Sequence, residues 1–426
     1  MFDKALQVFR IAELRNKIVT VLGLLVVFRL FAAIPISGVD IEQLRNFFSS
    51  NQLLGFLNIF SGGGLSNLSV AMLGVGPYIT ATIIMQLLTM VFPNLKKLYY
   101  EEGPAGRAKF NRISRYLTVP LAALQGYGFL NLLISQNVLQ PLDLFGMIRN
   151  VVLIVTGTLI LMWLGEIITE KKIGNGISLI IFAGIVSGLP QYFTQLYFQL
   201  RTATFEDPTK YLVFALVSVL VIAGVVFINE GERKVPISYA RRVRGTKLFG
   251  GVSSYLPLKV NQAGVIPIIF AISLLLFPQF FAQMLAPFSP GLSATLTGII
   301  TRAFNNPFVY SVFYFALVVV FTFFYTAVTF DPREISKNLQ QGGGFIPGIR
   351  PGGPTGEFLK KIINRITLPG AIFLGAIAVL PTLSQAVIGG PLFQVGGIAL
   401  LIVVAVALET MRQIDSQLTV REYEGL

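Results

Sequence analysis

Two residue types are missing from this 426-residue chain, which contains no cysteine and no histidine. Their absence excludes disulfide frameworks, thiol nucleophiles, imidazole bases and the usual ligand sets of zinc, haem and iron–sulfur sites. Charge is also scarce, because Asp, Glu, Lys and Arg make up 12% of the residues, against about 25% in a soluble domain. Since 54% of the residues are hydrophobic, the composition is typical of an integral membrane protein.

Long uncharged apolar runs are the main feature that is present. A helix needs about 20 mainly apolar residues to cross a bilayer, and the runs and their breaks give ten candidate spans. We therefore predict an all-α integral membrane protein. The predicted spans are residues 19–36, 74–92, 113–134, 150–168, 177–197, 211–229, 263–285, 309–330, 368–387 and 395–410. No small-residue cleavage site follows the first run, so we expect it to remain as an anchor.

The formal net charge of +13 is concentrated on one side of the predicted spans. If the N-terminus is cytoplasmic, most of the 33 Lys and Arg residues fall in cytoplasmic tails and loops. Because cytoplasmic loops carry the excess of positive charge, we expect both termini in the cytoplasm. Two of these loops, residues 230–262 and 331–367, are much longer than ordinary connections, and such loops are usually functional. We expect both to project as a docking surface.

The predicted spans divide into two groups of five. Asp207-Pro208 marks a turn between the fifth and sixth spans. We therefore expect an N-terminal half at residues 1–200, an external hinge at 201–210 and a C-terminal half at 211–426. Inverted repeats are a known membrane architecture, although the sequence shows no convincing similarity between the two halves.

Motifs for nucleotide binding and ion coupling are weak or missing. The glycines at 62–64 lack a following Lys-Ser/Thr, and the Gly-Asn-Gly at 174–176 has no third glycine and follows no predicted strand. The span interiors hold no central Asp, Glu or Lys, which ion-coupled transporters usually carry. Arg29 is the exceptional charge, and we expect it to snorkel, with pairing inside the bundle as the alternative. We predict no enzyme, metal or cofactor, and keep a secondary transporter for a small solute as the alternative function.

A short apolar segment follows the first span. Leu65–Leu73 is apolar enough to enter the membrane but too short to cross it, and Gly74, Gly76 and Pro77 separate it from the next span. Such broken backbone is tolerated at membrane depth only when it is buried in protein or lines an aqueous cavity. The segment predicts a re-entrant half-helix, with a flexible external loop as the alternative.

Five sequence blocks resemble the SecY family, whose members are central subunits of bacterial protein-conducting channels. The blocks are FSGGGLSNLSVAMLGVGPYITATIIMQLL from Phe60, TEKKIGNGISLIIFAGI from Thr169, LPLKVNQAGVIPIIFA from Leu256, FDPREISKNL from Phe330 and GGFIPGIRPGGPT from Gly343. The resemblance implies ten transmembrane helices in two pseudo-symmetric five-helix halves around a central pore, with residues 61–73 as an external plug. The plug residues that it implies are Gly62, Gly63, Gly64, Leu65, Leu68 and Met72.

The resemblance also implies a ring of aliphatic side chains that closes the pore. Its members, called here the aliphatic ring, are Val75, Ile79, Ile181, Ile269 and Ile402. Val75 and Ile79 are four residues apart, so they share one helix face. A ring of branched apolar side chains repels water and ions by dewetting and offers a passing chain no directional bonds. From periodicity alone, the same five residues would be ordinary packing residues.

A lateral gate toward lipid is implied between the second and seventh spans. Gln86 and Asn261 match the polar positions along this seam. Such polar pairs in a membrane contribute only about 0.6 to 2 kcal/mol, so they can separate. Two unrelated polar residues in interhelical contacts remain the alternative for Gln86.

The long basic loops are implied to receive the partners of the channel. The matching residues are Arg241, Arg242, Arg244 and Arg350. Arginine suits both the carboxylates of a motor protein and the phosphates of ribosomal RNA. The resemblance implies the membrane subunits SecE and SecG, the SecA ATPase, the ribosome, preproteins with their signal peptides, and membrane lipid as partners. It implies a multi-pass protein of the bacterial inner membrane that translocates unfolded preproteins and releases apolar segments into the bilayer.

Overall fold

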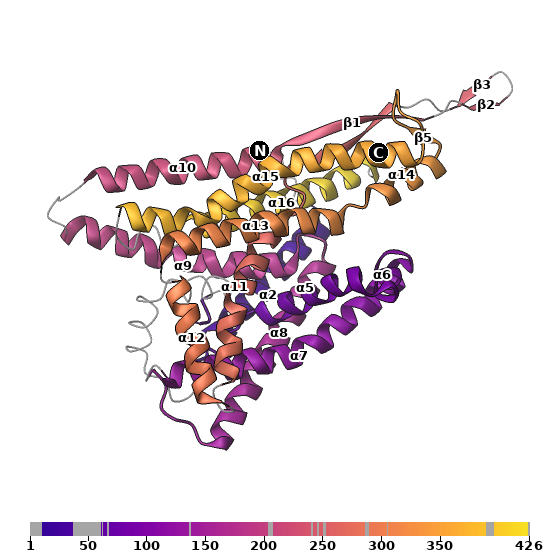
Figure 1. Ribbon diagram of the computed structural model, residues 1–426. Coiled ribbons are helices and arrows are strands. Elements are labelled where there is room, and N and C mark those ends of the chain that lie inside the picture. Colours follow the sequence, from indigo (N-terminus) through magenta and orange to yellow (C-terminus); the bar gives the residue numbers. More distant parts are fainter. Residues whose placement is uncertain are drawn as a thin grey trace.

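The computed structural model consists mainly of α-helices packed into one bundle (Figure 1). It describes residues 11–36, 61, 63–65, 68–135, 138–202, 208–239, 242–244, 247–249, 253–285, 289–304, 306–388 and 396–424.

A helix covers most of each predicted span. These helices are α2 (Ala12–Ala33), α5 (Gly76–Val91), α7 (Gly103–Ser135), α8 (Leu144–Glu170), α9 (Gly176–Thr202), α10 (Pro208–Glu230), α11 (Ile266–Met284), α13 (Pro307–Thr329), α15 (Gly353–Ile388) and α16 (Gly396–Glu424). In the described part of the chain, five helices are long and apolar enough to cross a membrane, and up to six if the bent pair of α5 and α6 (Pro93–Tyr100) forms one span. The full count of ten spans remains a prediction.

Local sequence defines several helix ends. The Asp143 side chain accepts a hydrogen bond from the Gly146 N–H at 3.0 Å at the start of α8. The Asn306 side chain does the same for Phe308 at the start of α13. These side chains satisfy N–H groups that the first turn of a helix leaves without partners.

Apolar side chains also cover the outside of the bundle. Val19, Leu22, Val26 and Leu30 form a stripe along α2, and each is more than half exposed. Their spacing of three or four residues places them on one helix face. Such a stripe is unfavourable in water but is the ordinary surface of a helix that faces lipid or another apolar helix.

The two long loops form a joint structure. The first loop contains an antiparallel hairpin of β1 (Glu232–Tyr239) and β4 (Ser253–Lys259), paired from Glu232↔Lys259 to Ser238↔Ser253. The second loop contributes α14 (Pro332–Gln341) and β5 (Gly344–Phe345), which pairs with β1 to give the strand order β4-β1-β5.

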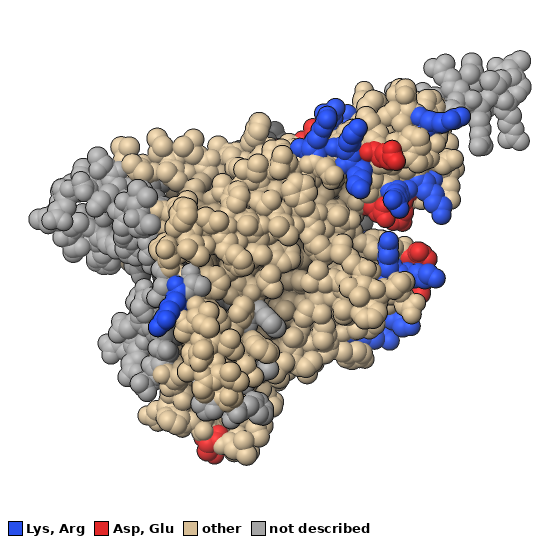
Figure 2. Space-filling model, viewed as in Figure 1, with Lys and Arg blue, Asp and Glu red and all other residues tan. Residues whose placement is uncertain are grey.

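The remaining elements are a second pair of strands and one additional helix. At the far end of the hairpin, β2 (Arg242–Arg244) pairs with β3 (Lys247–Phe249) (Figure 1). An additional helix, α12 (Pro290–Phe304), lies between α11 and α13 and was not among the predicted spans. Figure 2 shows most of the visible Lys and Arg side chains at the end of the molecule that carries α6, α14 and the hairpin.

The three largest apolar clusters among the described residues organise the interior. The central cluster unites residues of α2, α8, α9, α10, α11, α13, α15 and α16 with Val75. The plug-side cluster joins the segment before α5 to α7 and α8. The hairpin cluster packs Val235 and Leu258 of the β-hairpin against Leu359 and Ile362 of α15. Together they bury side chains from both predicted halves of the chain.

Candidate constriction and plug

The five residues of the aliphatic ring all lie in or against the central cluster. Val75, Ile181, Ile269 and Ile402 are buried, with exposed fractions of 0%, 2%, 8% and 1%, and Ile79 is partly buried and packs against the same cluster. They come from four separate places in the chain: the start of α5, α9, α11 and α16. The structure therefore brings together residues that are more than 300 positions apart at the extremes.

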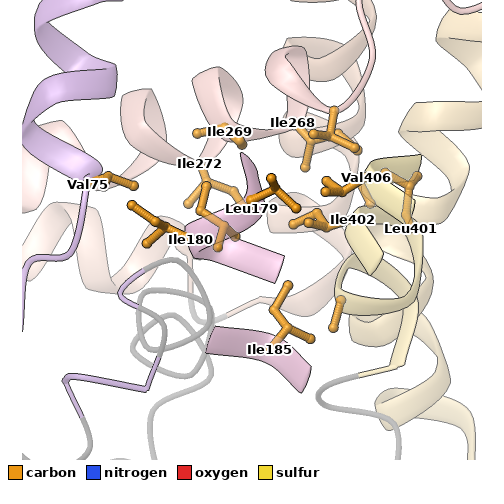
Figure 3. Close-up of a cluster of buried hydrophobic side chains, with 14 of the residues drawn as sticks. Val75, Leu179, Ile180, Ile185, Ile268, Ile269, Ile272, Leu401, Ile402 and Val406 are labelled. Carbon is orange, nitrogen blue, oxygen red and sulfur yellow. The ribbon is translucent and has the colours of Figure 1, made fainter. Parts of the chain in front are cut away.

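Figure 3 shows how these elements meet. Val75, Ile269 and Ile402 lie on different sides of the labelled group, and Ile180 of α9 lies beside Val75. The labelled side chains are hydrocarbon throughout, so they offer no donor, acceptor or charge to water or to a peptide. An arrangement of this kind excludes water while it is closed and holds a passing chain only weakly.

The family resemblance did not indicate several other side chains of this junction. They are Leu179, Ile180, Ile185, Ile268, Ile272, Leu401 and Val406. A signal for some of them was present, because Ile185 lies four residues after Ile181 and Val406 four residues after Ile402. That spacing places each pair on one helix face. Periodicity could thus have extended the ring once its first members were chosen.

The predicted half-helix is not found in the described part of the plug segment. The described residues between Gly63 and Val75 form turns, apart from Ser69, which makes an isolated antiparallel bridge with Pro35; the turns include hydrogen bonds from Met72 N–H to the Ser69 carbonyl at 2.9 Å and from Gly74 N–H to the Ala71 carbonyl at 2.8 Å. Positive φ angles at Gly63 (80°) and Gly74 (56°) interrupt a right-handed helix. The prediction of a half-helix was therefore wrong for this part of the segment. The alternative, a flexible external loop, does not fit either, because Leu65, Leu68 and Met72 are buried.

The plug residues are packed into protein. Leu65, Leu68 and Met72 are 1–2% exposed and lie in the plug-side cluster with Phe129 of α7 and Ile154 of α8. Gly63 and Gly64 also lie in this segment, whereas Gly62 lies outside the described residues. The three apolar side chains thus attach the segment to the N-terminal half.

Backbone contacts also hold the plug segment. Ile36 N–H donates to the Leu68 carbonyl at 2.8 Å, and Val70 N–H donates to the Ile34 carbonyl at 3.0 Å. On the other side, a Cβ placed on Gly157 of α8 would lie 2.1 Å from the Val70 carbonyl oxygen. Only glycine allows this close approach of the plug segment to α8.

Arg29 lies beside the plug segment. Its Nη1 is 3.7 Å from the position that a Cβ on Gly63 would take, and its guanidinium carbon is 5.8 Å from the ring centre of Phe28. The side chain is partly buried. This position favours the alternative, a contact inside the bundle, over the snorkelling that we expected for Arg29.

The side chains of the two proposed gate residues make no hydrogen bond to each other within the described residues. Asn261 donates to the Asn229 side chain at 2.9 Å. Among the described residues, the side-chain oxygens of Gln86 and Asn261 are both buried without a hydrogen-bond partner, as is that of Gln262. Buried acceptors of this kind are costly, and the structure shows no direct pairing of Gln86 with Asn261.

The predicted docking residues are only partly described. Arg350 is exposed, and its main-chain carbonyl accepts a hydrogen bond from the Thr355 hydroxyl at 2.9 Å. Arg242 and Arg244 lie in β2, and Arg241 lies outside the described residues. The structure places Arg350 and the hairpin at the same end of the molecule, since β5 and β1 belong to one sheet.

Comparisons with known proteins agree with this architecture. A family model described as SecY matches residues 69–411. A protein translocase subunit SecY of Streptomyces coelicolor is 42% identical, with 98% of each chain covered. A protein of the same name from Mycobacterium leprae is 41% identical, covering 100% of this chain and 99% of the relative.

Solved structures show the same fold at low sequence identity. One is described as "The structure of a protein conducting channel"; it has a TM-score of 0.65 and 20% identity, with 92% of this chain and 90% of that chain covered. Another, "Sec61 in the Canine ribosome-channel complex from the endoplasmic reticulum", has a TM-score of 0.62 and 19% identity, with 92% and 90% covered.

Proposed function

This chain belongs to the SecY family, and we propose that it conducts unfolded polypeptide through the junction of α5, α9, α11 and α16. It is a translocase channel subunit rather than a catalytic enzyme. The observation that carries the proposal is the convergence of hydrocarbon side chains from these four elements on one buried junction. A small-solute transporter would instead need polar groups at its binding site to recognise the solute.

The hydrocarbon side chains of the aliphatic ring account both for the seal against ions and for the passage of a polypeptide. While no substrate is present, the aliphatic ring packs with little exposed surface, and the plug segment lies against α7 and α8. An extended chain that enters displaces these contacts without breaking side-chain hydrogen bonds of the ring, because hydrocarbon side chains form none. The hydrophobic surface that is lost is partly replaced by contacts with the substrate.

We assign the two five-helix halves, the plug and the lateral gate on the family relationship. In this proposal, α5 and α11 separate to release apolar segments into lipid. The side-chain oxygens of Gln86 and Asn261, which lack donors within the described residues, are supplied with them by water or by the substrate backbone when the seam opens. Polar groups that lack partners in the closed state favour a seam that separates readily.

We further propose that both termini and the two basic loops face the cytoplasm of a bacterial cell. Positive charge at the end of the molecule that carries the hairpin supports this orientation. Docking of the SecA ATPase or of a ribosome at Arg350 and the hairpin would supply the driving force, and SecE and SecG would complete the channel within the membrane.

The absence of native cysteine makes a direct test clean. Ile402→Cys is reconstituted with its membrane partners, SecA and ATP, and a preprotein with one cysteine is stalled in transit. We expect a disulfide between the introduced thiol at position 402 and the stalled chain. The matched control is Leu22→Cys, whose position is 57% exposed on the outer face of α2.

Two results would contradict the proposal. One is equal crosslinking at the ring position and the outer face, since the substrate would then not pass the junction. The other is uptake of a small solute by vesicles that transport no preprotein, which would favour the transporter.

A further inference from the structure

A hydrogen bond joins α6 to the end of α13, two elements from opposite predicted halves. The hydroxyl of Tyr100, the last residue of α6, donates to the main-chain carbonyl of Val328 at 2.5 Å. The two residues are 228 positions apart. Because α6 follows α5 after a single residue, this bond connects the end of α5 to the C-terminal half.

The Val328 carbonyl needs a donor from outside its helix. Within an α-helix it would accept from the N–H four residues later, but that residue is Pro332, which has no N–H. Helix α13 also ends one residue after Val328, so its last carbonyls require other partners. The Tyr100 hydroxyl supplies one.

Aromatic packing holds the Tyr100 ring in position. The ring centre of Tyr99 is 4.9 Å from that of Tyr100 and 4.7 Å from that of Phe110 in α7. Leu98 is buried with Phe110 in the same apolar group. Since α6 is bent by 113° from α5, it lies outside the direction of the span and is fixed to α7.

The hydroxyl remains a donor across the physiological range of pH. Burial, followed by the nearby Tyr99, Asp331 and Glu334, raises the pKa of Tyr100 to about 12. The phenol is therefore protonated at neutral pH.

The bond lies across the proposed lateral seam. Helix α11 packs against α5 and α7 from the other half. It is in turn joined to α13 by Phe270, whose ring centre is 5.8 Å from that of Phe321 and 6.0 Å from that of Tyr325. Thus α5, α6 and α7 lie on one side of the seam, and α11 and α13 on the other.

We propose that Tyr100 is a positioning residue that holds the cytoplasmic end of this seam closed. The inference rests on the lateral gate of the proposed function. Opening would break the bond between Tyr100 and Val328 and expose the carbonyl to water or to an incoming signal peptide. Loss of the hydroxyl alone would then shift the seam toward its open state.

The test compares Tyr100→Phe with Tyr99→Phe in the full chain in lipid nanodiscs. Both variants keep the aromatic ring, and the Tyr99 hydroxyl makes no hydrogen bond within the described residues, so it is the matched control. Spin labels are attached through the substitutions Met90→Cys in α5 and Leu274→Cys in α11, at positions that are 56% and 46% exposed. Their distance distribution is measured with and without a synthetic signal peptide.

We expect Tyr100→Phe to raise the ratio of long to short distances without peptide by about 2- to 10-fold, the effect of one net hydrogen bond. Tyr99→Phe should match the unsubstituted chain. Identical distributions for all three proteins would overturn the inference. If Tyr100→Phe changes the distance distribution but the signal peptide does not, the role of the Tyr100–Val328 hydrogen bond is supported and the proposed gating by signal peptides is contradicted. The two ideas are therefore tested separately.

Discussion

Shortening two residues of the aliphatic ring should make the closed channel leak ions. Ile181 and Ile402 are 2% and 1% exposed, and each isoleucine loses three carbons when replaced by alanine. At about 0.8 kcal/mol per buried CH2 group, the double variant lowers the cost of wetting the junction by up to about 5 kcal/mol. Since about 1.4 kcal/mol is a factor of ten, the wetted population rises by up to several thousandfold.

The assay is conductance of the purified channel in planar bilayers without substrate. Ile363→Ala is the matched control, because Ile363 is 4% exposed and lies in a helix interior but belongs to the hairpin cluster. It loses the same side-chain volume per site without touching the junction. Equal conductance for the double variant and the control would refute the reasoning, because the ring would then not be the barrier to ions.

Three further changes probe the plug and the docking surface. Gly157→Ala should push the Val70 carbonyl, which would lie 2.1 Å from the new Cβ, away from α8 and raise ion leak in the same assay. Arg29→Leu should also raise leak, because it removes the guanidinium beside the plug segment, whereas Arg29→Lys should restore part of the seal. Arg350→Glu should reduce transport driven by SecA about tenfold or more, since reversing an exposed interface charge weakens docking, and this is measured as protease-protected preprotein.

Controls separate these effects from general damage. Gly298→Ala adds a Cβ with no atom within 4 Å, so it should leave conductance unchanged. Lys361→Glu reverses an exposed charge in the neighbouring helix α15 and should reduce transport less than Arg350→Glu. Unaltered leak in Gly157→Ala would mean that the close contact with α8 does not position the plug, and full transport by Arg350→Glu would remove this arginine from the docking surface.

The sequence predicted the helices well because membrane spans depend on local composition. Each apolar run lies within or overlaps a helix, and the boundaries differ where helices continue into polar sequence, as in α15 and α16. Helix α12 was missed because its stretch is short and is preceded by Pro287 and begins at Pro290. Its structure depends on packing against α11 and α13.

Contacts between distant segments could not be predicted from local sequence. The pairing of β5 with β1 joins two loops that are separated by α11, α12 and α13. No pattern in the local sequence of either loop predicts this pairing. The plug segment was misjudged for a related reason, since Ile34 and Ile36 draw its backbone into hydrogen bonds that compete with a helix. The ring residues came from family resemblance, because their spacing alone is that of ordinary core positions.

The three-stranded sheet has a mechanical consequence. Because β1 pairs with both β4 and β5, and Val235 and Leu258 pack on Leu359 of α15, the described strands of the two loops form one unit that rests on a helix of the bundle. A force on β4 or on β5 therefore reaches α15 through the shared strand β1. A partner that grips only the hairpin can therefore exert torque on the helical body.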